Sequence, residues 1–304
     1  NFEVPFKDNK APLYNDWNPY ERNHWGYMTT FFFAPESYYA SDGTDIPGSW
    51  NGRDGRSVNE IKDMVKAFHK KDIAVIMDVV YNHVSNYDWN PLKYIDRGMY
   101  FRLDENDDYI AHSGCGNDTQ SEHPKMQQLI LESLKYWMIE YHVDGFRFDL
   151  GNLIDAETRQ LIIDELKTIN PHVILLAEPW GNGYDPDGFS DMGWASFNDQ
   201  FRDGLKGDVF DIEEKGFLFG HHQGNNDQKF LQRLVMGSLR KYDGKYIKSA
   251  HSVNYLECHD NYTLGDRLRI TGGYVDKDGK ITNTEKNALV QDKLLAMNKL
   301  AALF

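Results

Sequence analysis

The chain has 304 residues, of which 40% are hydrophobic, so it is long enough to bury a large core in one domain or two. Its net charge of −14 argues against a nucleic-acid partner, since binding phosphates requires a basic face. The sequence has no run of about 18 apolar residues, so it predicts no membrane span, and its two cysteines are too few for a disulfide framework.

The first part of the chain predicts a strand, a helix and a second strand. Residues 29–33 are a β-rich run, and Ser57 to Glu60 form a capping box that opens a helix. The apolar stripe of that helix is Ile61, Met64, Val65 and Phe68. Residues 73–80 are a continuous apolar run typical of a strand buried on both faces. A polar insertion without regular structure is expected at about 85–123.

The rest of the chain alternates between helices and strands. Pro124 starts a helix and Asp155 caps a second one. Strands are expected at 142–150, 173–177, 194–198 and 252–258, with a further helix at roughly 227–239. The chain begins without Met or a signal peptide and ends inside an apolar helical pattern, so we interpret it as a fragment whose compartment, cytoplasmic or secreted, stays open.

This order of elements favours an α/β fold of parallel βαβ units. Polar residues fall at or just past the carboxyl ends of the strands: His83, Arg147, Asp149, Glu178, His259 and Asp260. That placement is typical of a (β/α)₈ TIM barrel, whereas a doubly wound sheet would show a Gly-rich turn after its first strand. With about six strands counted, we interpret residues 1–304 as a catalytic barrel fragment that would need one more strand at each end, with the insertion at about 85–123 after strand 3.

The residue types at these strand ends suit the hydrolysis of glycosidic bonds. Asp149, Glu178 and Asp260 supply three carboxylates, and no nucleophilic Ser or Cys lies beside a base. In this chemistry one carboxylate attacks the anomeric carbon and another protonates the leaving oxygen. Alternation along the strand places Arg147 and Asp149 on one side, so the guanidinium would keep Asp149 ionised as the nucleophile.

Glu178 is the candidate acid, because Pro179 and Trp180 give it an apolar setting that would keep it protonated. Asp260 can bind sugar hydroxyls and favour a distorted ring. His83 and His259 are expected to donate hydrogen bonds to the same sugar. Each residue alone fits a structural role equally well, and their common position at successive strand ends is what favours a site.

Four segments of the chain carry a resemblance. They are Asp78-Val79-Val80-Tyr81-Asn82-His83, Gly145-Phe146-Arg147-Phe148-Asp149, Ala177-Glu178-Pro179-Trp180 and Glu257-Cys258-His259-Asp260. In order and spacing they resemble the four signature regions of the α-amylase family (glycoside hydrolase family 13).

The resemblance implies a (β/α)₈ barrel and a retaining mechanism. Asp149 would be the nucleophile, Glu178 the acid/base and Asp260 the stabiliser of the transition state. The remaining residues would hold the sugar in subsite −1 or support those that do. Those expected to contact substrate are Tyr27 (by stacking), His83, Arg147, Trp180 and His259, while Asp78 would brace Arg147 and Asn82 would play a supporting part.

Within the family the chain is most similar to type I pullulanases and related glycogen- and starch-debranching enzymes. The segments that carry this likeness are Ser113-Gly114-Cys115-Gly116-Asn117-Asp118 and Val253-Asn254-Tyr255. It implies hydrolysis of α-1,6 branch linkages in pullulan, starch or glycogen. Met28 and Gly265 depart from the pullulanase pattern beside the substrate groove, and leave an α-1,4-acting amylase or a glucan-transferring or branching enzyme as alternatives.

No metal is expected to be required. Many α-amylases bind calcium beside the excursion after strand 3, but the excursion is short here. An acidic run could bind a hard cation such as calcium, although we interpret it as a solvated loop: Asp104, Glu105, Asp107 and Asp108. A metal-dependent barrel hydrolase is a weaker rival, because the sequence has no His-x-His or His-Glu-x-x-His. The expected partner is an α-glucan polysaccharide, with no nucleic acid and no membrane.

Overall fold

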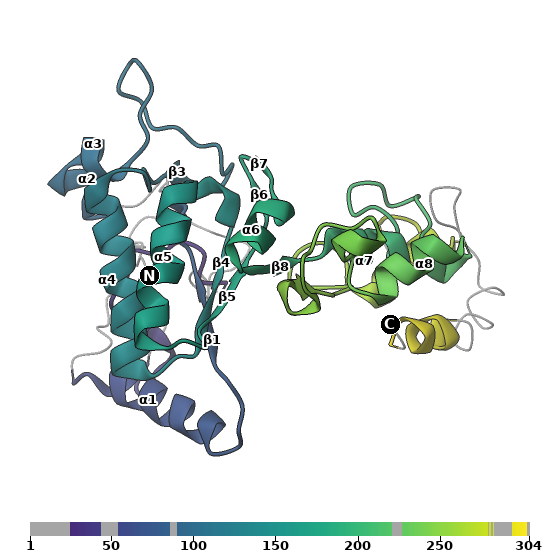
Figure 1. Ribbon diagram of the computed structural model, residues 1–304, viewed down its shortest axis with the longest axis horizontal. Coiled ribbons are helices and arrows are strands. Elements are labelled where there is room, and N and C mark those ends of the chain that lie inside the picture. The colour runs from purple at the N-terminus through teal and green to yellow at the C-terminus, as the bar shows by residue number, and fades with distance from the viewer. Residues whose placement is uncertain are drawn as a thin grey trace. The chain divides into compact units, whose positions relative to one another are not determined.

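The computed structural model describes residues 25–43, 54–85, 90–220, 227–278, 280, 282 and 294–302. The chain forms two units, Asn1–Asp185 and Pro186–Phe304 (Figure 1). Within the described ranges no helix has the length and apolar character that crossing a membrane requires.

A parallel sheet lies in the first unit, where β4 (Gly145–Phe148) pairs with β1 (Ile76–Val79) on one side and with β5 (Ile174–Ala177) on the other. The predicted parallel order of these strands is confirmed. All four residues of β4 are buried. The register places Arg147 directly opposite Asp78, so two charged side chains lie next to each other on neighbouring strands.

Three long helices accompany this sheet, namely α1 (Arg56–His69), α4 (Pro124–Tyr141) and α5 (Ala156–Ile169). α4 packs against α5 and also contacts α1. The predicted starts of α4 and α5 are confirmed, and the Asp155 carboxylate accepts a 3.0 Å hydrogen bond from the Thr158 amide. The buried face of α4 consists of Met126, Ile130, Ser133, Leu134, Trp137, Met138 and Tyr141.

The strand predicted at residues 29–33 is wrong, because this segment consists of turns and bends. Within it, the side chain of Phe32 is buried. The Phe32 carbonyl oxygen accepts hydrogen bonds from Ser133 Oγ at 2.6 Å and from Trp137 Nε1 at 2.9 Å. Side chains of α4 therefore satisfy a backbone group that a strand would have paired with a neighbouring strand.

The capping box predicted for α1 is also wrong, although the helix itself is confirmed. The N-cap is Gly55 in a left-handed conformation, and no side chain caps the helix there. Ser57 lies inside the helix, and the Glu60 carboxylate instead accepts hydrogen bonds from the amide and the hydroxyl of Ser41, the first at 2.9 Å. The Glu60 carboxylate thus binds a residue distant in sequence, Ser41, and does not cap its own helix.

The apolar run at 73–80 is buried only in its second half. Ile73 and Ile76 are 47% and 41% exposed, whereas Val79 and Val80 are each 5% exposed. The expectation of burial on both faces is therefore wrong for the first half. In the part of the chain that the structure describes, β4 is the one strand neighbour of β1, so the other edge of β1 is not covered by a strand.

The insertion predicted at 85–123 has more regular structure than expected. It contains the short helices α2 (Leu92–Ile95) and α3 (Arg97–Tyr100), and its strand β3 (Asn117–Asp118) pairs antiparallel with β2 (His83–Val84). Residues 86–89 lie outside the described ranges. The pairing brings the end of the insertion directly beside His83. Shorter elements of this unit are η1 (Ser37–Tyr39), η2 (Gly151–Leu153) and the hairpin of β6 (Trp180–Gly181) and β7 (Gly183–Tyr184).

In the second unit β8 (Ala195–Phe197) pairs in parallel with β9 (Ser252–Val253). The strand predicted at 252–258 is thus wrong beyond its first two residues. At the next position the Asn254 side chain accepts a 3.1 Å hydrogen bond from Asn198 Nδ2. Beyond Val253, a hydrogen bond between side chains therefore replaces the backbone pairing of the two strands.

The second unit also contains several helices that the sequence did not predict. Its helical elements are α6 (Pro186–Met192), α7 (Asp199–Lys206), η3 (Phe217–Phe219), α8 (Gln228–Val235), η4 (Arg240–Tyr242), η5 (Ser249–His251) and α9 (Leu264–Thr271). The helix predicted at 227–239 ends early, because Gly237 adopts a positive φ of 72° just after it.

The core of the second unit is an apolar cluster to which most of these helices contribute. Its buried members are Phe201, Leu205, Leu218, Phe230, Leu234, Leu268, Leu294, Met297 and Ala301. The last three belong to the predicted terminal helix, of which residues 294–301 are helical, residue 302 is a turn and residues 303–304 lie outside the described ranges.

Candidate active site

Seven of the predicted site residues come together at or just past the strand ends of the first unit. They are Tyr27, Asp78, Asn82, His83, Arg147, Asp149 and Glu178, and each forms a hydrogen bond or an ion pair with at least one other member of the group. The parallel register of β1, β4 and β5 causes this, because it brings their carboxyl ends to one edge of the sheet.

Arg147 lies at the centre of this group. Its Nη1 is 2.9 Å from Asp78 Oδ1 and 3.3 Å from Asp149 Oδ1, and its Nη2 is 2.5 Å from Glu178 Oε1. Burial alone would lower the pKa of the guanidinium, but the charges of Glu178 and Asp78 outweigh it and hold that pKa above its usual range. One buried cation therefore contacts three carboxylates, and Asp78 makes the contact that its predicted bracing role requires.

Tyr27 joins the group through its hydroxyl. It donates a 2.6 Å hydrogen bond to Asp78 Oδ2, and its oxygen is 3.2 Å from Arg147 Nη1. The guanidinium carbon of Arg147 lies 5.6 Å from the centre of the Tyr27 ring. Burial, followed by the hydrogen bond to Asp78, raises the pKa of Tyr27, so the phenol stays neutral. Its predicted stacking on a sugar stays a prediction.

Variants of Tyr27 separate its ring from its hydroxyl. Tyr27→Ala is expected to raise the KM for α-glucans about three- to tenfold, the size of a lost ring-stacking contact. Tyr27→Phe keeps the ring, and Arg147 still holds Asp78, so a smaller rise is expected. Steady-state kinetics on short oligosaccharides measure both, with Tyr94→Ala at a 73% exposed position as the control. Equal effects of the two variants would show that the hydroxyl, not stacking, carries the role.

Asp149 is held from two sides. Its backbone amide donates to the Val79 carbonyl at 3.1 Å, which fixes the start of the turn after β4. Asn82 Nδ2 donates to the Asp149 carbonyl at 2.8 Å and to its Oδ2 at 2.9 Å. The carboxylate is thus oriented by neutral donors on one oxygen and by Arg147 on the other.

Glu178 lies in a more polar setting than its sequence neighbours suggested. Its Oε1 contacts Arg147, and its Oε2 accepts a 2.8 Å hydrogen bond from the Leu150 amide. Both contacts stabilise the ionised carboxylate. The expectation of an apolar setting is therefore wrong, because the turn after β4 and the guanidinium, neither adjacent in sequence, surround this carboxyl group.

His83 is 1% exposed and lies between the turn after β4 and the end of the insertion. Its Nδ1 is 2.6 Å from Asn82 Oδ1. Burial lowers the pKa of His83, although the charges of Asp149 and Asp118 oppose that shift. At neutral pH the ring is therefore uncharged.

Two residues of this site were missed by sequence reasoning about function. Leu150 has φ 39° and ψ 48°, a left-handed conformation that is uncommon for a Leu, and its amide binds Glu178. Gly116 packs against β2, since a Cβ there would lie 2.9 Å from His83 Cδ2 and 2.1 Å from the Val84 carbonyl oxygen. Gly116 stands in a segment that the family resemblance had singled out, whereas no signal in the sequence pointed to Leu150.

Three predicted site residues remain, two of them in the second unit. His259 and Asp260 follow β9 in the second unit, with 3.6 Å between His259 Nε2 and Asp260 Oδ2 and with side chains 30% and 56% exposed. Trp180 begins β6 and is partly buried. The roles predicted for these three residues stay predictions.

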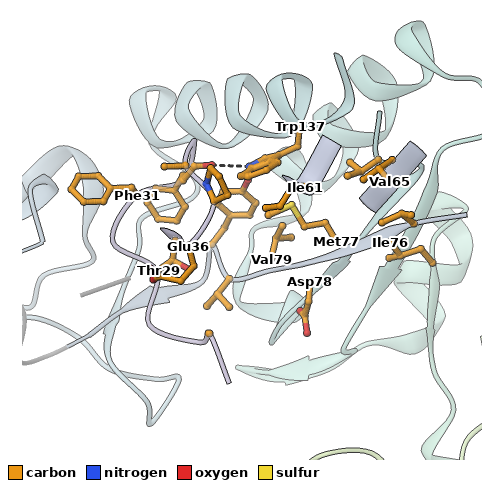
Figure 2. Close-up of a pocket in the computed structure, with 18 of the residues that line it drawn as sticks. Thr29, Phe31, Glu36, Ile61, Val65, Ile76, Met77, Asp78, Val79 and Trp137 are labelled. Carbon is orange, nitrogen blue, oxygen red and sulfur yellow. Dashed lines mark hydrogen bonds between the residues drawn. The ribbon is translucent and has the colours of Figure 1, made fainter. Parts of the chain in front are cut away.

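A cavity of about 340 Å³ runs along β1 (Figure 2). Its walls are mainly apolar and include Phe31, Val65 and Trp137, whereas Asp149 and Glu178 do not line it. Figure 2 shows Asp78 pointing away from the labelled apolar side chains. The predicted nucleophile and acid therefore lie outside this cavity, whose polar lining residues include Thr29, Glu36 and Asp78.

No metal ligand set is evident in the part of the chain that the structure describes. Among those residues, three or more His, Cys, Asp or Glu side chains are nowhere grouped so that they could hold a metal ion. The acidic run at 104–108 forms a turn in which Asp104 accepts the amides of Asn106 and Asp108 at 2.8 and 2.9 Å. That calcium is not required stays a prediction.

Comparison with known proteins shows several relatives. The chain is 32% identical over 260 residues to the pullulanase of Bacillus subtilis (strain 168), covering 82% of this chain and 35% of the relative. It is 35% identical over 278 residues to the chloroplastic isoamylase 3 of Oryza sativa subsp. japonica, covering 85% of this chain and 33% of the relative. The chain thus spans about a third of the length of these relatives. No protein-family model matches it.

Solved structures are similar as well. The pullulanase from Bacillus acidopullulyticus has a TM-score of 0.76 at 32% identity, covering 91% of this chain and 32% of that one. The pullulanase from Anoxybacillus sp. LM18-11, complexed with maltotetraose, has a TM-score of 0.70 at 34% identity, covering 84% of this chain and 36% of that one. These matches confirm the predicted α/β barrel class.

Proposed function

This chain belongs to the pullulanases, isoamylases and glycogen-debranching enzymes of the α-amylase family, and from that membership we propose that it is a retaining hydrolase of α-1,6 branch linkages in α-glucans. The observation that carries the proposal is that Asp149 and Glu178 bind the two terminal nitrogens of one guanidinium. Retaining glycosidases need two carboxyl groups only about 5 Å apart, and a shared Arg147 keeps the pair close.

In the proposed reaction Asp149 attacks the anomeric carbon and forms a covalent glycosyl-enzyme. Glu178 protonates the leaving oxygen and then takes a proton from the water that hydrolyses the intermediate. Arg147 and Asn82 hold the Asp149 carboxylate in place for attack. Asp260 would stabilise the transition state, in the role that the family resemblance gives it.

Glu178 must gain a proton before it can act as the acid. Arg147 and the Leu150 amide contact its two oxygens, and both contacts favour the ionised form. A sugar that displaces water from this 4% exposed residue would favour the neutral form, because desolvation penalises the charge. We therefore expect substrate binding and protonation of Glu178 to be coupled.

The proposed substrates are pullulan, starch and glycogen. The complex of the Anoxybacillus pullulanase with maltotetraose supports an α-glucan as ligand. Gly265, one of the two departures from the pullulanase pattern, has only Thr263 Oγ1 within 4 Å of the place that a Cβ would take, at 3.9 Å. Because Gly265 departs from the pullulanase pattern and leaves space open there, we keep an α-1,4-acting amylase as the second candidate.

Analysis of the products from pullulan and amylose tests the linkage. We expect maltotriose from pullulan and no cleavage of amylose. Maltose-type products from amylose, with pullulan left intact, would instead identify an α-1,4-acting amylase. Altered branching without new reducing ends would identify a glucan-transferring or branching enzyme.

A further inference from the structure

Asn82 is a buried amide, 1% exposed, that lies between two predicted catalytic or binding residues. Its Nδ2 is 2.8 Å from the Asp149 carbonyl oxygen and 2.9 Å from Asp149 Oδ2. Its Oδ1 is 2.6 Å from His83 Nδ1. Both ends of one amide are therefore engaged by groups of the candidate site.

These contacts determine which way the amide faces. A backbone carbonyl and a carboxylate can only accept hydrogen bonds, so the atom of Asn82 that contacts both must be the NH₂ group. Its oxygen must then face His83, and a 2.6 Å contact between that oxygen and Nδ1 requires a proton on Nδ1. Through Asn82, the Asp149 carboxylate selects the tautomer of His83. In this tautomer Nε2 can only accept, contrary to the expectation that His83 donates a hydrogen bond to the sugar.

The same amide reaches Glu178 through one peptide group. Asn82 holds the carbonyl of the Asp149–Leu150 peptide, and the amide of that peptide donates to Glu178 Oε2 at 2.8 Å. Because a peptide group is planar and rigid, fixing its oxygen also fixes the direction of its N–H. Leu150, directly after this peptide, has a strained left-handed backbone (φ 39°).

We propose that Asn82 is a positioning residue that sets the Nδ1–H tautomer of His83, the orientation of Asp149 and, through the Asp149–Leu150 peptide, the hydrogen bond to Glu178. The part of this inference that concerns turnover rests on the proposed function. The part that concerns the histidine proton does not.

The protonation state and tautomer of His83 can be measured, and an asparagine with a purely structural role would not affect them. The groups that face this ring are Asn82 beside it, the Asp149 carboxylate after β4, the Asp118 carboxylate of β3 and the Tyr27 backbone. At pH 8 the wild-type ring is expected to be neutral with its proton on Nδ1, visible as a characteristic ¹⁵N pattern in long-range ¹H–¹⁵N spectra. A proton on Nε2 alone, or a cationic ring, would overturn the proposal without any variant.

Two variants test the link. Asn82→Ala removes the acceptor at Nδ1, so the proton of His83 should move wholly or partly to Nε2. Asn82→Asp keeps the acceptor at Nδ1 but replaces the NH₂ group that binds the Asp149 carbonyl and Oδ2 with an oxygen, so it should disturb Asp149 while His83 keeps its proton on Nδ1. Each should lower kcat on pullulan about ten- to hundredfold, because small misplacements of reacting groups have effects of that size.

Thr158→Val is the matched control, since it removes another fully buried hydrogen bond, from Thr158 Oγ1 to the Ser121 carbonyl, at the start of α5. It should lower the melting temperature and leave the His83 spectrum and kcat unchanged. Retention of the Nδ1–H tautomer in Asn82→Ala, together with an unchanged kcat, would overturn the proposal. If Asn82→Ala does not fold, the isosteric Asn82→Asp decides, and a kcat on pullulan equal to that of the wild type would count against the link. Failure of the wild type to hydrolyse any α-glucan would overturn the proposed function and leave the spectroscopic result standing.

Discussion

The substitution Asp149→Asn is expected to lower kcat/KM on α-glucans by at least about a hundredfold, because an amide cannot form the covalent glycosyl-enzyme. Its effect on folding should be small, within about 1 kcal/mol. The amide oxygen of the new residue can still accept from Asn82, and Arg147 keeps its contacts with Asp78 and Glu178. Loss of turnover without loss of stability is the signature of a nucleophile.

Activity assays and thermal melts on the same preparations measure this. Asp155→Asn is the matched control: it makes the same change at the N-cap of α5, where Asn caps a helix as well as Asp does. That variant should keep its activity. Residual hydrolysis by Asp149→Asn above about one part in a hundred of the wild-type rate would remove Asp149 from the nucleophile role.

The substitution Glu178→Gln is expected to abolish most hydrolysis of polysaccharides, with a fall of about a hundred- to ten-thousandfold, the range for a lost general acid. A substrate with a good leaving group, such as an α-glucosyl fluoride, needs no protonation and should still form the glycosyl-enzyme. Azide should then replace the unactivated water and raise the turnover rate, giving a glycosyl azide as product.

Glu165→Gln controls for the chemical change, because Glu165 pairs with Lys135 on the surface of α5 at 2.8 Å, in an ion pair of small energetic weight. It should leave all rates unchanged. Absence of azide rescue in Glu178→Gln, on a fluoride that the variant still consumes, would argue against the acid/base assignment.

Much of the local structure followed from the sequence. The β4 strand, the starts of α4 and α5 and the parallel order of β1, β4 and β5 were predicted, because burial periodicity and capping residues act within a few positions of the chain. The polar residues at the strand ends were predicted for the same reason, since they directly follow buried runs. Elements whose ends depend on distant contacts, such as the short β9, were placed wrongly.

Local rules failed wherever a distant group competed for a hydrogen bond. Glu60 was expected to cap its own helix, but Ser41 binds its carboxylate. Residues 29–33 were expected to be a strand, but side chains of α4 bind the Phe32 carbonyl. In both places the local sequence pattern matches the predicted element. A partner far away in the sequence instead forms the hydrogen bond with the group that the pattern needed, the Glu60 carboxylate in one case and the Phe32 carbonyl in the other.

The sequence by itself determined the family, the barrel class and the residues to consider for catalysis, because these depend on residue types and their spacing. Only the tertiary structure decided the partners of those residues: Arg147 shared by three carboxylates, Glu178 in a polar setting and Asn82 joining His83 to Asp149. The physical reason is that a hydrogen bond depends on distance and direction between atoms, and the register of neighbouring strands sets both. Residues that lie 67 positions apart, such as Asn82 and Asp149, meet only after the sheet has formed.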